Sequence, residues 1–230
     1  MRLHSGRTSW LRATVSVFLK DTRIEWRSRF GINLLVLFVL SSVFILVFAL
    51  GQDTVERNVI AALYWIVIIF AATSSLGRSF ISEEEGGTVL LLQTHVPGSA
   101  VFAGKLLFNL VLILIANVLA SLAFTVFINA TIANWPIFVV IVVLGSSGLA
   151  GATTILAAII ARTGNGGSLL PVLLLPILMP LLLSVVHAMI AALEPGSSWN
   201  DVGNDIATLV AYAGTVVTAS VLLFDFVWKD

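Results

Sequence analysis

Long uncharged hydrophobic blocks dominate the sequence, whereas strict alternation of apolar and polar residues is absent. Blocks of 18 or more apolar residues are typical of membrane-spanning helices, because about 20 residues are needed to cross the hydrocarbon core. Short polar links separate most of these blocks. The pattern therefore predicts an all-α integral membrane protein with six spans, at about residues 33–50, 59–76, 106–128, 136–161, 169–193 and 206–227.

Residues 1–32 precede the first span and form the most basic part of the chain. Arginines and lysines alternate there with large apolar side chains such as Trp10, Val15 and Phe18. This pattern predicts an amphipathic helix that lies in the membrane interface. About thirty residues before the apolar block argue against a signal peptide. We expect residues 33–230 to form one six-helix permease domain.

Composition agrees with a membrane protein and excludes several other classes. The chain is 59% hydrophobic and 10% charged, whereas soluble domains are about 45–50% apolar and about 25% charged. The absence of cysteine excludes disulfides, thiol catalysis and cysteine metal sites. The net charge of zero gives no basic field for nucleic acid.

The distribution of lysine and arginine predicts the orientation. With six spans, the N-terminus, residues 77–105, the turn at Arg162 and the C-terminus share one side of the membrane. That side carries all of the 12 Lys and Arg residues except Arg57. Cytoplasmic segments of membrane proteins are enriched in Lys and Arg, so both termini are expected in the cytoplasm. The protein itself is expected in the inner membrane of the cell.

Residues 77–105 are the one substantial polar insertion between spans. Ser82 and Glu85 have the spacing of a capping box, and three consecutive acids suit the positive end of a helix. An apolar patch, 89–92, follows, and Pro97 with Gly98 ends the segment. The spacing fits a docking element for a soluble partner and an ordinary interfacial helix-turn equally well.

The chain shows no energy source of its own. The stretch from Gly98 to Lys105 departs from a phosphate-binding P-loop in its glycine spacing, and Leu106 replaces the hydroxyl residue that would hold Mg²⁺. No Asp, Glu, Lys or Arg falls in the middle of a predicted span, which disfavours ion coupling. We therefore expect no enzyme activity, and a scaffold or channel remains the alternative to a transporter subunit.

Two motifs resemble a known family. The first is Glu85-Gly86-Gly87-Thr88 with Leu91-Leu92, Pro97 and Gly104-Lys105, which is similar to the loop of ABC-2-type (type V-like) permeases. The second is the run with Pro171, Pro176 and Pro180 that enters the fifth span. Together they resemble CcmB, the haem exporter protein B family of cytochrome c maturation, over nearly the whole chain.

The resemblance implies a permease subunit that couples ATP hydrolysis by a partner to haem delivery or to release of a haem-loaded chaperone. It implies a CcmA-like ATPase carrying ATP and Mg²⁺, a second copy of this chain, CcmC- and CcmD-like membrane subunits, and the chaperone CcmE. Haem is then handled by the complex, and no resident cofactor, metal or nucleic acid is expected in this chain. Export of another substrate, or an ion-independent channel or scaffold, is the alternative function. The residues expected to dock the ATPase are Glu83, Glu84, Glu85, Gly87, Thr88, Leu91 and Pro97.

Two further features of the spans have functional interpretations. Pro176 and Pro180 fall inside the fifth span and remove backbone hydrogen bonds, whereas Pro171 can begin a helix. They predict a kinked helix that is either structural or part of a conduit. His187 in the same span is either a haem ligand or an interfacial histidine. In the fourth span, small residues from Gly145 to Ala152 predict close helix contact.

Overall fold

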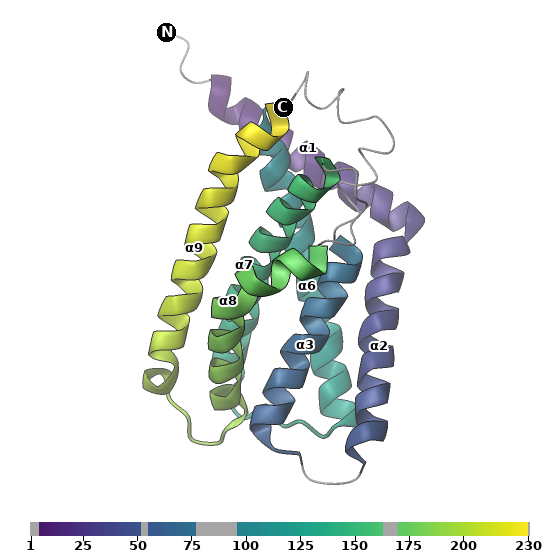
Figure 1. Ribbon diagram of the computed structural model, residues 1–230, viewed down its shortest axis with the longest axis vertical. Helices are drawn as coiled ribbons and strands as arrows, with labels where there is room; N and C mark the ends of the chain where they lie inside the picture. Colours follow the sequence, from purple (N-terminus) through teal and green to yellow (C-terminus); the bar gives the residue numbers. More distant parts are fainter. Residues whose placement is uncertain (1–4, 52–54, 77–95, 163–169, 230) are drawn as a thin grey trace.

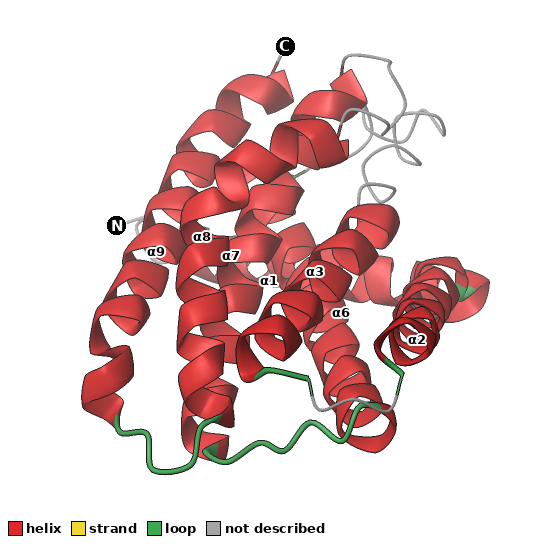
Figure 2. Ribbon diagram, turned by 60° about the horizontal axis from the view of Figure 1, so that its bottom comes forward, coloured by secondary structure: helices red, strands yellow, loops and turns green. Residues whose placement is uncertain are grey.

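The computed structural model describes residues 5–51, 55–76, 96–162 and 170–229. This part of the chain contains seven α-helices and no strand (Figure 2). All of them except α1 are long and apolar enough to cross a membrane, which confirms the predicted fold class and the six spans. The helices are α1 (Ser5–Ser28), α2 (Phe30–Leu50), α3 (Arg57–Leu76), α6 (Gly98–Phe127), α7 (Trp135–Arg162), α8 (Leu170–Leu193) and α9 (Trp199–Lys229).

The six long helices run up and down as a bundle, and both chain termini lie at the same end (Figure 1). Helix α1 lies across that end, over the beginning of α6. We call it the terminal end and the opposite one the distal end. Short described loops join α6 to α7 and α8 to α9 at the distal end (Figure 2).

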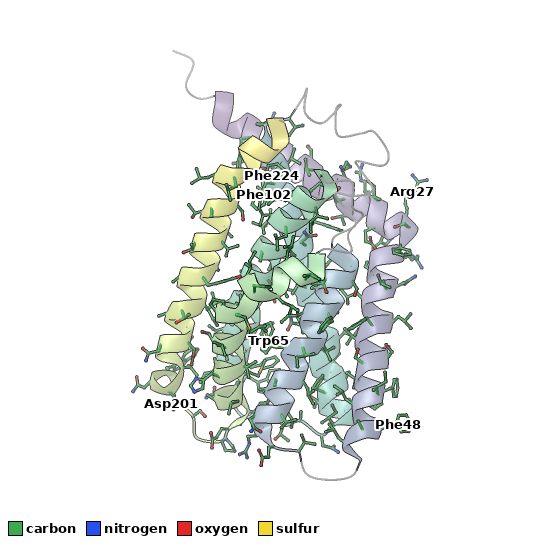
Figure 3. All side chains as sticks on the ribbon, viewed as in Figure 1. Arg27, Phe48, Trp65, Phe102, Asp201 and Phe224 are labelled. Atoms are coloured by element: carbon green, nitrogen blue, oxygen red, sulfur yellow. The ribbon has the colours of Figure 1, made fainter. Side chains whose placement is uncertain are left out.

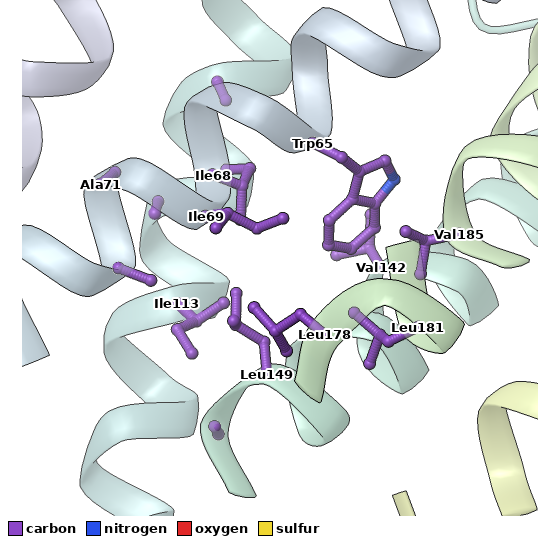
Figure 4. Packing of buried hydrophobic residues seen from close by; sticks show 14 of the residues in the cluster. Trp65, Ile68, Ile69, Ala71, Ile113, Val142, Leu149, Leu178, Leu181 and Val185 are labelled. Atoms are coloured by element: carbon purple, nitrogen blue, oxygen red, sulfur yellow. The ribbon is translucent and has the colours of Figure 1, made fainter. Parts of the chain in front are cut away.

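Helix α7 is the centre of the bundle, since it packs against α3, α6, α8 and α9. Its span is 67% buried, compared with 11% for that of α9. Beside it, the buried indole of Trp65 from α3 packs among aliphatic side chains of neighbouring helices (Figure 4). A peripheral helix such as α9 leaves most of its apolar surface for lipid.

Glycines on α7 allow this close packing. A Cβ atom at Gly145 would collide with Trp65 of α3 and Val185 of α8. One at Gly148 would collide with Leu181 and Tyr212. The predicted small-residue contact face is therefore confirmed, and its partners lie within the same chain. Lipid provides little hydrophobic driving force between helices, so such close approach supplies much of the association energy.

Two helices begin earlier than the hydrophobic pattern predicts. Helix α6 begins at Gly98, not near Leu106, because Lys105 is buried beneath α1 with an acidic partner. Helix α9 begins at Trp199, not near Ile206. The Ser198 amide and hydroxyl both donate to the Asp201 Oδ2 atom, at 2.8 and 3.0 Å, and this caps the helix. In both cases a polar residue belongs to the first turns of a helix.

Helix α8 contains Pro176 and Pro180 and bends strongly along its length (Figure 1). Its first turns run across the bundle before it turns toward the distal end. In the turn before Pro180, the Ile177 carbonyl accepts a hydrogen bond of 2.9 Å from the Tyr212 hydroxyl of α9. Pro176 and Pro180 have no backbone N–H to donate within the helix, which loosens it, and the Tyr212 bond ties the bent region to α9.

Candidate functional site

The predicted docking segment lies only partly within the described residues. Glu83, Glu84, Glu85, Gly87, Thr88 and Leu91 fall outside them. Pro97 is exposed and stands directly before α6 with an extended backbone (φ −63°, ψ 139°). The last eight residues of the predicted segment 77–105 form the first two turns of α6. The candidate docking segment therefore leads straight into a helix that traverses the bundle.

Helix α1 is seated on these first turns of α6. Thr14, Val17 and Asp21 are buried, and their spacing of three and four residues places them on one face of α1. The indole nitrogen of Trp10 donates to the Ser99 hydroxyl at 3.1 Å. Leu11, Val15 and Leu19 are exposed on another face. The interfacial interpretation of α1 thus missed a second face that contacts protein.

A buried ion pair joins the two helices. The Lys105 ammonium lies 3.3 Å from the Asp21 carboxylate, and the exposed fractions of the two side chains are 0% and 6%. Lys20 lies 3.2 Å from the same carboxylate and is partly exposed. Burial strengthens the attraction between the charges but makes either charge costly without its partner. Lys105, which the sequence suggested as part of a loop, is therefore a fixed point between α1 and α6.

Gly104 lets α1 approach α6 closely. A Cβ atom at this position would lie 2.8 Å from the Thr14 carbonyl oxygen and 2.8 Å from the Val17 Cβ atom. Neither atom belongs to the far end of a flexible side chain, so the backbone of α1 would have to move.

We expect Gly104→Ala to displace α1 from α6 at a cost of about 1–3 kcal/mol, which is usual for overpacking. The chain has no native cysteine, so a short bifunctional thiol reagent can report the distance between Trp10→Cys and Ser99→Cys without background. Crosslinking should fall in the Gly104→Ala background and persist in a Gly203→Ala background, where a Cβ atom meets open space. Equal crosslinking in both would contradict this packing.

The turn from α1 to α2 is fixed by Glu25 of α1. Arg29 has a left-handed backbone (φ 53°) at the point where the chain turns from α1, across the end of the bundle, into α2. The Glu25 carboxylate accepts a hydrogen bond of 2.8 Å from the Ile32 amide in the first turn of α2. A carboxylate at a helix N-terminus satisfies a free amide and interacts favourably with the helix dipole. The terminal end is thus held as one unit of α1, α2 and α6.

Uncharged polar side chains join α6 to α7 inside the bundle. Asn109 donates to the Thr154 hydroxyl at 2.8 Å, and Asn117 donates to the Ser146 hydroxyl at 3.1 Å. The two asparagines are eight residues apart, as are their partners, which matches the antiparallel order of the helices. Tyr64 of α3 donates to the Asn117 Oδ1 atom at 2.9 Å. Hydrophobicity patterns did not indicate this seam, although two asparagines in an apolar block are an available signal.

His187 of α8 pairs with Asp205 of α9 near the distal end. The Nδ1 atom of His187 lies 2.7 Å from the Asp205 Oδ2 atom. The histidine side chain is 71% exposed and the aspartate is 16% exposed. Asp205 directly precedes the sixth predicted span, and its partner lies 18 residues earlier in the chain, so the hydrophobic pattern did not indicate the pair.

A depression of about 510 Å³ opens at the distal end between α3, the α6–α7 loop and α8. Glu56, Arg57 and Glu194 line it together with apolar residues such as Ile60 and Leu193. None of the predicted site residues that the structure describes lines this depression. The described residues contain no cluster of three or more His, Asp or Glu side chains that could hold a metal ion.

These features define an all-helical integral membrane protein with six candidate spans and an N-terminal helix seated across the end that carries both termini. Comparison with known families identifies the family of the chain. The model of the CcmB protein family matches residues 12–228, and the chain belongs to that family.

Two relatives are similar over most of their length. Heme exporter protein B of Rhodobacter capsulatus is 30% identical over 175 residues, which cover 75% of this chain and 79% of the relative. Heme exporter protein B of Bradyrhizobium diazoefficiens is 26% identical over 180 residues, covering 77% of this chain and 81% of the relative. The family resemblance expected from the loop and proline motifs is therefore confirmed.

Proposed function

We propose that this chain is the membrane-spanning permease subunit of an ABC-type complex for cytochrome c maturation. In this proposal a partner subunit hydrolyses ATP, and the complex uses that energy for haem delivery or for release of a haem-loaded chaperone. The observation that carries the proposal is the CcmB family match over residues 12–228, with relatives named heme exporter protein B. Because the sequence has no P-loop, the energy has to arrive through a surface of the protein.

The terminal end provides a mechanical basis for such coupling. A partner bound at residues 77–97 would act directly on α6, which begins at Gly98. Helix α1 would move with α6, since the Asp21–Lys105 pair and the contact at Gly104 connect them. Farther along α6, Asn109 and Asn117 connect it to α7. A displacement at the docking segment therefore has a continuous packed route to the centre of the bundle.

The remaining parts of the proposal follow from charge and family. In this proposal the terminal end faces the cytoplasm and the protein lies in the inner membrane, and the distribution of Lys and Arg supports that orientation. Docking residues are Glu83, Glu84, Glu85, Gly87, Thr88, Leu91 and Pro97. Partners are a CcmA-like ATPase with its ATP and Mg²⁺, a second copy of this chain, CcmC- and CcmD-like subunits, and CcmE as chaperone.

Charge reversal tests the docking. We expect Glu84→Lys with Glu85→Lys to reduce recovery of the ATPase subunit in co-purification by at least about tenfold, because loss of a buried charge pair at an interface costs about 2–5 kcal/mol. The amount of inserted membrane protein should stay unchanged. The measurement is the ratio of ATPase to permease after purification from membranes that contain both.

A matched comparison neutralises two acids in each of two variants. The test variant is Glu84→Gln with Glu85→Gln in the loop. The control variant is Glu56→Gln with Glu194→Gln at the distal end. Both distal acids are exposed. Only the loop pair should lower ATPase recovery. Full recovery and full ATP-dependent activity with the reversed loop charges would rule out these acids as docking residues.

A further inference from the structure

The His187–Asp205 pair has a defined hydrogen-bonding direction. A carboxylate can only accept hydrogen bonds, so at 2.7 Å the Nδ1 atom of His187 carries the proton and donates it to Asp205. In the neutral form of the ring, Nε2 is then the nitrogen that carries the lone pair. Asp205 is largely buried and His187 is largely exposed, so most of the imidazole ring is accessible from outside the bundle.

This arrangement is the one that metal-binding histidines adopt. Such a histidine usually donates its second ring N–H to a carboxylate or carbonyl, which fixes its tautomer and raises its basicity toward the metal. Haem iron is commonly held by a single histidine, with the opposite axial position available to another ligand. One ordered imidazole is therefore sufficient for haem, although it is too little for a structural zinc site.

The position of the pair suits an amphiphilic ligand. His187 lies six residues before the end of α8, and Asp205 lies six residues after the start of α9. At 1.5 Å per residue both are about 9 Å from the distal helix ends. Leu183, one turn before His187 on α8, is strongly exposed and apolar, while Asn204 and Thr208 of α9 are exposed and polar. A flat porphyrin could rest against the apolar surface with its carboxylates toward the polar helix ends.

We propose that His187 is an axial ligand through which this chain holds haem at the distal end of α8 and α9, with Asp205 as its positioning residue. The proposal rests on the proposed function, which supplies haem as the cargo. Among the described residues this site offers the iron one ligand, so the opposite axial position is available to a group from a receiving protein. The site is thus suited to transient holding and transfer.

The test is an absorbance titration of the purified full-length chain in detergent micelles with hemin, followed in the Soret region. The wild-type protein should show a saturable shift of one haem per chain, above the partition into empty micelles. His187→Gln keeps a hydrogen-bonding group beside Asp205 but provides a poor iron ligand, and should weaken binding at least about tenfold. Asp205→Asn should weaken it by about 10–100-fold, as loss of a carboxylate behind a metal-bound histidine does.

Two further variants separate ligation from a merely structural tie between α8 and α9. His95→Ala is the matched control, since it removes a histidine from the predicted loop, and its titration should equal that of the wild type. His187→Gly should lose the Soret shift and regain it when imidazole is added, because free imidazole can occupy the vacated position. A structural role would predict loss of thermal stability without imidazole-dependent recovery of the spectrum.

The proposal is overturned if the wild type shows no saturable shift, or if His187→Gln binds hemin as the wild type does. Failure of the proposed function would look different. ATPase recovery with the permease, and its loss on charge reversal of Glu84 and Glu85, do not depend on His187. A chain that retains its ATPase partner but gives no hemin titration would refute the haem site alone.

Discussion

Replacing Lys105 by methionine is expected to lower the free energy of unfolding by about 3–5 kcal/mol, because the change leaves the buried Asp21 carboxylate without its partner on α6. Methionine has nearly the length of lysine, so packing beneath α1 is retained and the effect reports the charge. Lys20 also lies 3.2 Å from Asp21. Its side chain is partly exposed, and exposed ion pairs contribute only about 0–1 kcal/mol, so it compensates for little of the loss.

A double variant distinguishes a lost ion pair from a general defect. Asp21→Asn with Lys105→Met removes both charges, and replacing a buried pair with neutral groups is often close to neutral for stability. The double variant should therefore be more stable than Lys105→Met alone. Unfolding by SDS in mixed micelles gives the required free energies. Arg57→Gln, an exposed cation at the distal end, is the control and should change stability by less than about 0.5 kcal/mol. Additive effects of the two single variants would show that the charges do not interact.

Replacing Gly145 by alanine is expected to destabilise the centre of the bundle by about 1–3 kcal/mol, the usual cost of overpacking. The new Cβ atom would collide with the indole of Trp65 and would lie 2.9 Å from the Val185 Cγ1 atom. Trp65 is fully buried among the aliphatic side chains shown in Figure 4, so it has no space into which to move. The collision would therefore disturb the packing of α7 against both α3 and α8.

The matched control is Gly214→Ala in α9, where a Cβ atom meets no neighbour. Alanine is favoured over glycine in a helix by about 1 kcal/mol, so the control should be neutral or slightly stabilising. The difference between the two variants in SDS unfolding isolates the steric term. Equal stability of Gly145→Ala and Gly214→Ala would contradict the close contact between α3 and α7.

An aromatic contact joins α6 to α9 at the terminal end, whereas other large side chains at the ends of the bundle are exposed. At the terminal end, Phe102 of α6 and Phe224 of α9 pack together with ring centroids 5.3 Å apart (Figure 3). Both are fully buried, so α9 is held against α6 near the seat of α1. At the distal end, Phe48 of α2 and Asp201 of α9 are exposed (Figure 3). At the terminal end α6 is thus contacted by both α1 and α9.

The sequence alone determined the number of spans, the fold class and the family. These depend on local quantities: the length of an apolar block against the thickness of a membrane, and short motifs around Gly87, Pro97 and the prolines of α8. Lysine and arginine counts also predicted a common side for both termini, which the even number of spans supports. None of these inferences requires knowledge of which helix contacts which.

Tertiary structure decided which polar residues have partners. Lys105 seemed to belong to a loop because a lone lysine is costly within a span, yet Asp21, 84 residues earlier, makes it part of α6. Asn109 and Asn117 stand out as polar residues in an apolar block, but their partners are known only once α7 lies antiparallel to α6. His187 is a lone histidine until α9 brings Asp205 within 2.7 Å. Pairing of this kind depends on helix packing and register, and neither can be predicted from the hydropathy of the sequence.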